Sequence, residues 1–275
     1  MTDRRFLPAT DRVAHESLRG RIEGRVFVPG RPARIAVPLV DLCTAPDGKR
    51  DRQLPLGTHF TVIEERGAHA FGFAGAHGYC GWLPVAALGP GREATHWLAV
   101  PASHLYPGPD LKLREIAALS LGARVTVEGD ENGFARTPDG WVWLRHLRPL
   151  GDWLENPVTV ARGYLGTPYL WGGDGYAGLD CSGLVHAARA ACGLTCPPDS
   201  DLQRAMPGAD IPAGEEQPGD LVFWKGHVAM VSAPGMIVHS NAHHMATVEE
   251  PLAPVTQRIE AAGGGPLLRR LRPAG

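Results

Sequence analysis

The chain has 275 residues, of which 44% are hydrophobic and 20% charged, and its formal net charge at neutral pH is -2. A charge this close to zero argues against a protein that binds nucleic acid or an anionic membrane through a basic surface. The length predicts more than one domain, each able to bury a core of its own.

The first segment, residues 1–33, is predicted to be an N-terminal arm. Within it, Thr10 to Arg19 is compatible with one short capped helix. The arm lacks the apolar run of about 7–15 residues that a secretory signal needs, and no later run reaches the ~18 residues of a membrane helix. The expected location is therefore the cytoplasm.

Two copies of a β-rich pattern follow the arm. The matching segments are residues 36–43 with 99–106 and residues 54–62 with 119–127. Each copy closes on a Gly-Trp pair, at Trp82 and at Trp141. Copies of about 60 residues with Gly and Pro turns predict two small β-barrels, since a solenoid needs at least three repeats. We place the first module at residues 34–89 and the second at residues 92–150.

Cys181 lies between a glycine-rich turn and an apolar run, residues 184–191, that is typical of a helix. A thiol at a helix N-terminus feels the positive end of the helix dipole and unpaired N–H groups, which lower its pKa from about 8.5. The same N–H groups are able to hold an oxyanion. We therefore expect Cys181 to be a nucleophile, although its spacing alone also fits a small core residue.

Two histidines in strand-like surroundings supply a base for this thiol. His227 opens the apolar run that ends at Val231, and His239 follows Ile237 and Val238. In such a constellation the first imidazole takes the thiol proton and later gives it to the leaving amine, while the second orients the first. Either histidine alone would fit a structural role, but together with Cys181 they predict a triad.

At these residues the chain resembles the NlpC-type cysteine peptidases, a papain-like family that cuts peptides of the bacterial cell wall. The motifs follow the family's order: Pro168-Tyr169-x-Trp171-Gly172-Gly173, Asp180-Cys181-Ser182-Gly183, Pro198-Asp199-Ser200-x-x-Gln203, Gln217-Pro218-Gly219-Asp220-Leu221, Gly226-His227-Val228-Ala229-Met230 and His239. The resemblance implies an α+β, papain-like peptidase domain at residues 151–275. It makes Cys181 the nucleophile, His227 the base and His239 the third polar member.

The two β-modules resemble bacterial SH3-like domains, whose pattern ends in a similar Gly-Trp-hydrophobic strand. Two such modules before an NlpC-type domain are similar to cytoplasmic enzymes that recycle cell-wall peptides. The resemblance implies cleavage between γ-D-glutamate and L-lysine or diaminopimelate in a free peptide with an unblocked N-terminal L-alanine. The product would be L-Ala-γ-D-Glu. The expected partner is this murein peptide, not nucleic acid or membrane, no cofactor is implied, and the oligomeric state is open.

The same resemblance implies which residues hold the substrate. Tyr169 and Ser182 are assigned to the oxyanion or substrate site, and Asp180, Asp199 and Ser200 to substrate binding. Tyr79, in the match Gly78-Tyr79-Cys80-Gly81-Trp82, is assigned to the substrate's amine. A buried ammonium needs polar partners, and we expect the first module to wall off that end of the cleft. The alternatives are a barrel-surface tyrosine and an Asp-Ser pair that only caps a helix.

The other cysteines are assigned no function. Cys43, Cys80, Cys192 and Cys196 bring the total to five, an odd number in a chain long enough to bury its own core, so we expect no disulfide framework. Zinc ligands could be drawn from Cys192, Cys196, His243 and His244. Their spacing is weak for a zinc site, and no metal is assigned.

Three other functions stay open. An exported endopeptidase would act on intact peptidoglycan and use the SH3-like modules as wall anchors. A catalytically dead binding module would lack a reactive thiol. An acyltransferase or amidase could share the fold and the triad, because neither fixes the substrate.

Overall fold

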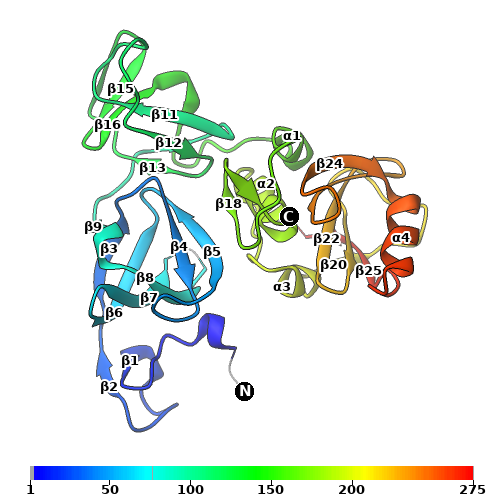
Figure 1. Cartoon of the computed structure of the whole chain (residues 1–275), viewed down its shortest axis with the longest axis horizontal. Coiled ribbons are helices and arrows are strands. Elements are labelled where there is room, and N and C mark those ends of the chain that lie inside the picture. The colour runs from blue at the N-terminus through cyan, green and yellow to red at the C-terminus, as the bar shows by residue number, and fades with distance from the viewer. Residues whose placement is uncertain (1–2, 76, 275) are drawn as a thin grey trace. The chain divides into compact units, whose positions relative to one another are not determined.

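The structure is a computed structural model that describes residues 3–75 and 77–274. The chain divides into two compact units, Met1–Leu150 and Gly151–Gly275, and each is described by itself (Figure 1). The outer limits predicted for the arm and for the peptidase domain, residues 1–2 and 275, lie outside the described residues. Within the described ranges, none of the helices is long and apolar enough to cross a membrane.

The arm is built of short strands and turns. Its elements are η1 (Arg4–Phe6), β1 (Val13–His15), the 3-10 turn η2 (Glu16–Leu18) and β2 (Val26–Val28). β1 pairs in parallel with β2 and buries Ala14 completely. The expectation of one capped helix over Thr10 to Arg19 was therefore wrong, because pairing with a distant strand outweighed a local capping signal.

The first module is one antiparallel sheet of seven strands, paired in the order β5-β4-β8-β7-β6-β3-β9. Its elements are β3 (Arg31–Ile35), β4 (Leu39–Cys43), β5 (Arg50–Pro55), β6 (His59–Arg66), β7 (His69–Ala74), β8 (Cys80–Pro84), the 3-10 turn η3 (Val85–Ala87) and β9 (Leu88–Pro90). Apolar side chains from these strands, such as Leu42, Phe60 and Leu83, form its buried core together with Tyr79.

The second module repeats this plan. Its elements are β10 (His96–Leu98), β11 (Ala102–Tyr106), β12 (Ala117–Ser120), β13 (Arg124–Val125), β14 (Gly129–Glu131), β15 (Phe134–Thr137), β16 (Gly140–Trp143), η4 (Leu144–His146) and β17 (Leu147–Pro149). β11 pairs with β12 and β16 as β4 pairs with β5 and β8, and β10 pairs with β17 as β3 pairs with β9. The module has its own core, which includes Leu98, Leu119 and Val142. The internal repeat of the sequence thus corresponds to a repeated strand pairing.

The second unit combines helices with a six-stranded antiparallel sheet, in the order β20-β25-β21-β22-β23-β24. The sheet strands are β20 (Gly208–Asp210), β21 (Leu221–Trp224), β22 (His227–Ala233), β23 (Met236–Asn241), β24 (Ala246–Pro251) and β25 (Arg269–Pro273). The other elements are α1 (Pro157–Arg162), the small hairpin of β18 (Asp174–Gly175) and β19 (Gly178–Leu179), α2 (Cys181–Ala190), α3 (Ser200–Arg204) and α4 (Leu252–Ala261).

Two helices of this unit lie on opposite sides of its sheet (Figure 1). α4 buries Val255 against alternate sheet residues such as Trp224 and Val231. α2 lies against β22 and β23. In the described residues the first unit contributes only strands and 3-10 turns, so the chain as a whole is mainly β and the predicted α+β character belongs to the second unit.

Candidate active site

α2 begins at Cys181 because Asp180 caps it. Asp180 has an extended backbone, and its Oδ1 accepts hydrogen bonds from the Gly183 N–H at 2.7 Å and the Ser182 hydroxyl at 2.9 Å. Its Oδ2 accepts from the Gly172 N–H at 2.9 Å. One carboxylate therefore fixes the helix start and the glycine-rich turn before it, and this capping role stands beside the substrate-binding role predicted for Asp180.

The turn and the helix approach each other very closely at two glycines. A Cβ added at Gly183 would clash with the carbonyl oxygen of Gly173. The motif therefore needs glycine next to Cys181 and Ser182 for a packing reason. The thiol thus stands where the turn and the helix are closely packed.

The Cys181 thiol is buried, and burial raises its pKa to about 12, with the charge of Asp180 adding to the effect. Backbone N–H groups of Val228 and Ser182 act in the opposite direction. The expectation that the helix N-terminus alone lowers the pKa of this thiol was therefore wrong, since desolvation outweighs it. The hydrogen bond from Val228 places the sulfur beside the residue that follows His227.

The two predicted histidines lie together on neighbouring strands. His227 Nε2 lies 2.8 Å from His239 Nδ1, and the ring centroids are 5.1 Å apart. Burial lowers the pKa of His227 to about 3 and also lowers the pKa of His239. Both rings are therefore neutral bases at neutral pH, and His227 starts the strand that packs against the cysteine's helix.

His227, His239 and a carboxylate that the sequence analysis did not identify form one hydrogen-bonded row. Glu250 Oε1 lies 2.8 Å from His239 Nε2, and Arg258 of α4 donates to both oxygens of Glu250 at 2.7 and 2.9 Å. The hydrogen bonds from Arg258 lower the pKa of Glu250 to about 2. The register of β23 and β24 places Glu250 diagonally from His239 on one face of the hairpin, a relation that the sequence alone does not record.

Tyr169 lies close to the thiol. It is half-buried, and burial, with the charges of Cys181 and Asp180, raises the pKa of its hydroxyl. Its backbone N–H donates to the Met245 carbonyl at 2.9 Å. The hydroxyl therefore stays protonated and able to donate, as an oxyanion or substrate site requires.

Ser182 is held from two sides. Its hydroxyl donates to Asp180, and its carbonyl accepts from the buried amide of Gln203 at 2.9 Å. Gln203 also donates to the Pro197 carbonyl at 2.9 Å, so it joins α3 to the start of α2. The Ser182 hydroxyl is engaged in capping, and its place at the substrate site stays a prediction.

Asp199 and Ser200 stand at the start of α3. Asp199 has the extended backbone of a cap but makes no capping hydrogen bond through its side chain, so the alternative reading as a simple helix cap does not hold for this residue. Its charge raises the pKa of Asp180, which places the two carboxylates near each other. Asp180 and Asp199 thus bring negative charge to the surroundings of Cys181.

Tyr79 belongs to the other unit. It is 2% exposed, the Phe6 ring meets it edge-on at 5.8 Å, and the Arg52 guanidinium lies 5.6 Å from its ring centroid. The alternative of a barrel-surface aromatic is therefore excluded. Its predicted contact with a substrate amine stays a prediction.

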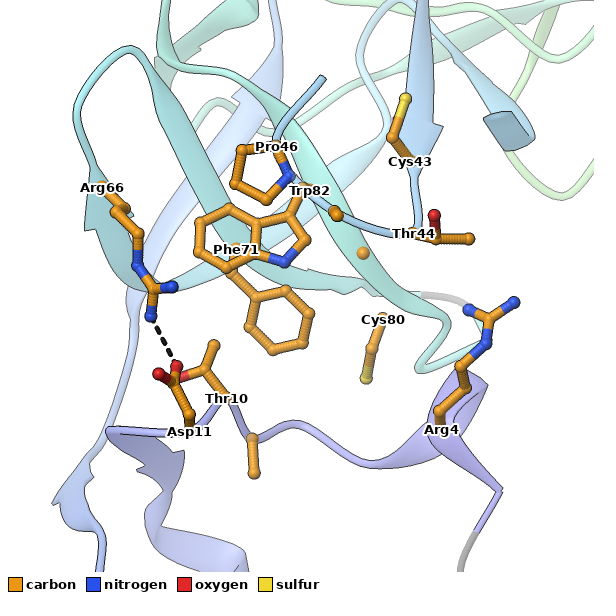
Figure 2. A pocket seen from close by; sticks show the side chains of 13 residues that line it. Arg4, Thr10, Asp11, Cys43, Thr44, Pro46, Arg66, Phe71, Cys80 and Trp82 are labelled. Carbon is orange, nitrogen blue, oxygen red and sulfur yellow. Dashed lines mark hydrogen bonds and ion pairs between the residues drawn. The ribbon is translucent and has the colours of Figure 1, made fainter. Parts of the chain in front are cut away.

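The first unit contains a cavity of about 290 Å³ between the arm and the sheet of the first module (Figure 2). Phe71 and Trp82 line it, together with Arg4 and Arg66. Both cations are paired, Arg4 with Asp51 and Arg66 with Asp11, each at 2.6 Å. The lining includes none of the predicted site residues.

All five cysteines are free thiols. Cys43 and Cys192 are half-buried, and Cys80 and Cys196 are buried. Across residues 3–75 and 77–274, no group of three or more His, Cys, Asp or Glu side chains is arranged to hold a metal ion.

A cysteine at the start of a helix, packed against an antiparallel sheet that carries a histidine pair, defines the second unit as a papain-like cysteine peptidase fold. Residues 166–259 match the NlpC/P60 family, and residues 42–88 match the bacterial dipeptidyl-peptidase SH3 domain. The chain therefore contains an NlpC/P60 cysteine peptidase domain preceded by a bacterial SH3 domain.

The chain is similar to two curated relatives and, in its fold, to one solved structure. The chain is 38% identical over 87 residues to dipeptidyl-peptidase 6 of Lysinibacillus sphaericus, covering 32% of each protein. It is 25% identical over 225 residues to the gamma-D-glutamyl-L-lysine dipeptidyl-peptidase of Bacillus cereus, covering 70% of this chain and 67% of that protein. The crystal structure of an NlpC/P60 family protein from Bacillus cereus shares its fold, with a TM-score of 0.75 at 23% identity over 88% of this chain and 99% of that one.

Proposed function

We propose that the protein is a cysteine endopeptidase that hydrolyses the γ-D-glutamyl-L-diamino-acid bond of free murein peptides with an unblocked N-terminal L-alanine. It releases L-Ala-γ-D-Glu in the cytoplasm, as a step in the reuse of cell-wall peptides. The observation that carries the proposal is the Cys181 thiol at the start of α2, beside the strand that presents the hydrogen-bonded pair His227 and His239. A relative named gamma-D-glutamyl-L-lysine dipeptidyl-peptidase supports the choice of bond.

The proposed reaction begins with proton transfer from Cys181 to His227. Because burial keeps both groups neutral, the thiolate is proposed to form when the substrate binds. The sulfur attacks the γ-glutamyl carbonyl, and backbone N–H groups at the start of α2, with the Tyr169 hydroxyl, stabilise the oxyanion. His227 then protonates the leaving amine of the diamino acid, and a water activated by the same ring hydrolyses the acyl-enzyme.

Substrate selection is proposed to rest on the free ammonium of L-alanine. Asp180 and Asp199 supply negative charge near the thiol, since the charge of Asp199 raises the pKa of Asp180. Ser200 follows Asp199 at the start of α3 and is assigned to the same subsite. Tyr79 of the first module is proposed to close the end of the cleft.

The second β-module is proposed to be a second SH3-like domain. Its strand pairing repeats that of the first module, part of which matches the bacterial SH3 domain.

Product analysis tests the function. The protein is incubated with L-Ala-γ-D-Glu-L-Lys and with L-Ala-γ-D-Glu-diaminopimelate, and the products are identified by mass spectrometry. We expect L-Ala-γ-D-Glu and the free diamino acid from at least one peptide. Release of other fragments would contradict the assigned bond, and faster digestion of intact sacculi would favour the exported wall endopeptidase.

A further inference from the structure

Glu250 connects the histidine pair to a fixed cation. Its Oε1 lies 2.8 Å from His239 Nε2 and 2.7 Å from Arg258 Nη2, and its Oε2 lies 2.9 Å from Arg258 Nη1. Because the guanidinium of Arg258 has only donors, both oxygens of Glu250 act as acceptors. An ionised carboxylate therefore ends the row that runs through His239 to His227.

This row determines which ring nitrogens carry protons. Nε2 of His239 lies 2.8 Å from Oε1 of Glu250 and 3.1 Å from the amide nitrogen of Asn241. Because the charged carboxylate is the stronger hydrogen-bond partner, we assign the proton of a neutral His239 to Nε2, so its Nδ1 carries a lone pair. That lone pair accepts from Nε2 of His227, 2.8 Å away. The nitrogen of His227 left without a proton is then Nδ1, which is the atom that can take the proton of Cys181.

We propose that Glu250, held by Arg258, is a positioning residue that sets the tautomer of His227 and stabilises the imidazolium formed when His227 takes the thiol proton. The inference rests on the proposed peptidase function. Glu250 acts through His239 rather than on the substrate, and a carboxylate placed behind a catalytic histidine in this way holds the ring and favours its charged form.

Glu250 and Arg258 have opposite effects on the pKa of the two histidines. Burial is the largest influence and lowers the pKa of both rings; Arg258 lowers them further, whereas Glu250 raises them. The groups that face Glu250 are His239 on β23, Arg258 on α4 and His244 in the turn before β24, whose Nε2 lies 3.4 Å away. Removing the carboxylate and removing the guanidinium therefore have opposite expected effects on imidazole protonation.

The test compares Glu250→Gln with Arg258→Gln in the full chain. Glu250→Gln keeps the shape and removes the charge, so kcat/KM on the murein tripeptide is expected to fall about ten- to a hundredfold. In the pH profile of kcat/KM, the limb that reports imidazole protonation should move to lower pH, because a carboxylate that raises the pKa of the histidines is gone. In Arg258→Gln the same limb should move to higher pH, because a cation that disfavours the imidazolium is gone.

Two further variants separate positioning from packing. Glu249→Gln is the matched control, because Glu249 is the next residue on β24, points to the other face and pairs with Arg162 at 2.6 Å. It is expected to keep the wild-type rate and pH profile. Glu250→Asp, which keeps the charge on a shorter side chain, should recover part of the rate lost in Glu250→Gln. Circular dichroism verifies that each variant is folded.

Alkylation gives a readout that needs no substrate. The rate at which iodoacetamide modifies Cys181, followed by mass spectrometry of the peptide that carries it, should show the same opposite shifts in pH dependence. If the wild type leaves γ-glutamyl peptides intact while alkylation shifts as expected, the proposed function fails and the role of Glu250 stands. Unchanged profiles, or shifts of the same sign in Glu250→Gln and Arg258→Gln, overturn the role of Glu250.

Discussion

The two units of this protein each contain a network of arginine and carboxylate groups. The networks differ in the side chain that they finally contact. In the first unit, Arg66 donates to Asp11 at 2.6 Å and to Glu64 at 3.0 Å, and its guanidinium lies 5.1 Å from the ring centroid of Trp82. Arg12 of the arm donates to the same Glu64 at 2.9 Å. These contacts hold the arm on the sheet and end on an indole, which does not act as an acid or a base near neutral pH.

In the second unit, the pair of Arg258 and Glu250 ends on two imidazoles beside a buried thiol. The contacts are of similar length, yet the group at the far end is an imidazole, and its strand packs against the helix that begins at Cys181. The comparison teaches that the chemical role of an ion pair depends on the side chain that it contacts. The lengths of the contacts within the pair do not decide it. Changes in the first network should affect stability, and changes along the second should affect the reaction.

The largest effect on activity is expected from Cys181→Ala, which removes the proposed nucleophile beside the second network. Hydrolysis should be abolished, because the acyl-enzyme route needs the sulfur. The melting temperature should change little, because the new side chain is a small apolar group in a buried site. Turnover is measured on the murein tripeptide beside a melting curve. Activity within about tenfold of the wild type would exclude the acyl-enzyme mechanism.

The next largest effects are expected along the histidine row. His227→Ala should be nearly as damaging as Cys181→Ala, because no base remains to take the thiol proton. His239→Gln should be milder, because an amide can still accept the hydrogen bond from His227. The measurement is kcat/KM for both variants under one set of conditions. Equal and complete loss in both would assign His239 a role beyond orientation.

A smaller effect is expected from blocking the substrate's amine. N-acetylation of L-alanine removes the ammonium charge that Asp180 and Asp199 are proposed to attract, and it adds bulk. Loss of a charge-assisted contact of about 1.5–3 kcal/mol corresponds to roughly ten- to a hundredfold in kcat/KM. Free and acetylated tripeptides are compared, with Tyr79→Ala expected to narrow the difference between them. Comparable rates on both peptides would reject recognition of a free amine.

The smallest effect on the reaction is expected in the first network. Glu64→Gln should leave kcat/KM unchanged, in contrast to Glu250→Gln. Glu64 has a side chain only 3% exposed, so loss of its charged hydrogen bonds should cost about 1–3 kcal/mol of unfolding free energy. Denaturation with urea measures this difference. A fall in activity comparable to that of Glu250→Gln would show that the two networks are coupled.

The pH dependence of this stability difference has a definite sign. Burial raises the pKa of Glu64, but hydrogen bonds from Thr10, Arg66 and Arg12 outweigh it and hold the pKa below its ordinary value. A lowered folded-state pKa stabilises above the unfolded pKa of about 4.3, and the contribution is lost as the pH falls through the folded pKa. The difference between Glu64→Gln and the wild type should therefore shrink below about pH 4. A difference that grows on acidification would contradict the assignment of the ion pair.

The sequence predicted well wherever the signal was local. The glycine-rich turn, the acidic cap and the apolar run around Cys181 lie within one short segment, and α2 begins at that residue. The predicted strand character of the segments that carry His227 and His239 likewise came from their own apolar runs, and both residues lie in strands. Their side chains meet because those strands are neighbours in the sheet.

The sequence failed wherever a distant partner decided the outcome. The arm adopts strands because β1 pairs with β2, which no capping signal can report. Glu250 and Arg258 were missed because one depends on the register of β23 and β24 and the other on the packing of α4 against the sheet. The pKa of Cys181 was predicted in the wrong direction because the helix N-terminus is visible in sequence and desolvation is not.

By itself the sequence determined the residue types of the site, the order of its elements and the repeated pattern of the β-modules. These properties depend on neighbours a few positions apart, whose spacing a linear pattern records. Only the tertiary structure decided that the thiol and the imidazoles are buried and neutral, and that an ion pair stands behind the second histidine. Burial and side-chain hydrogen bonding arise when strands and helices far apart in the chain come together, so the protonation of the site is a property of the fold.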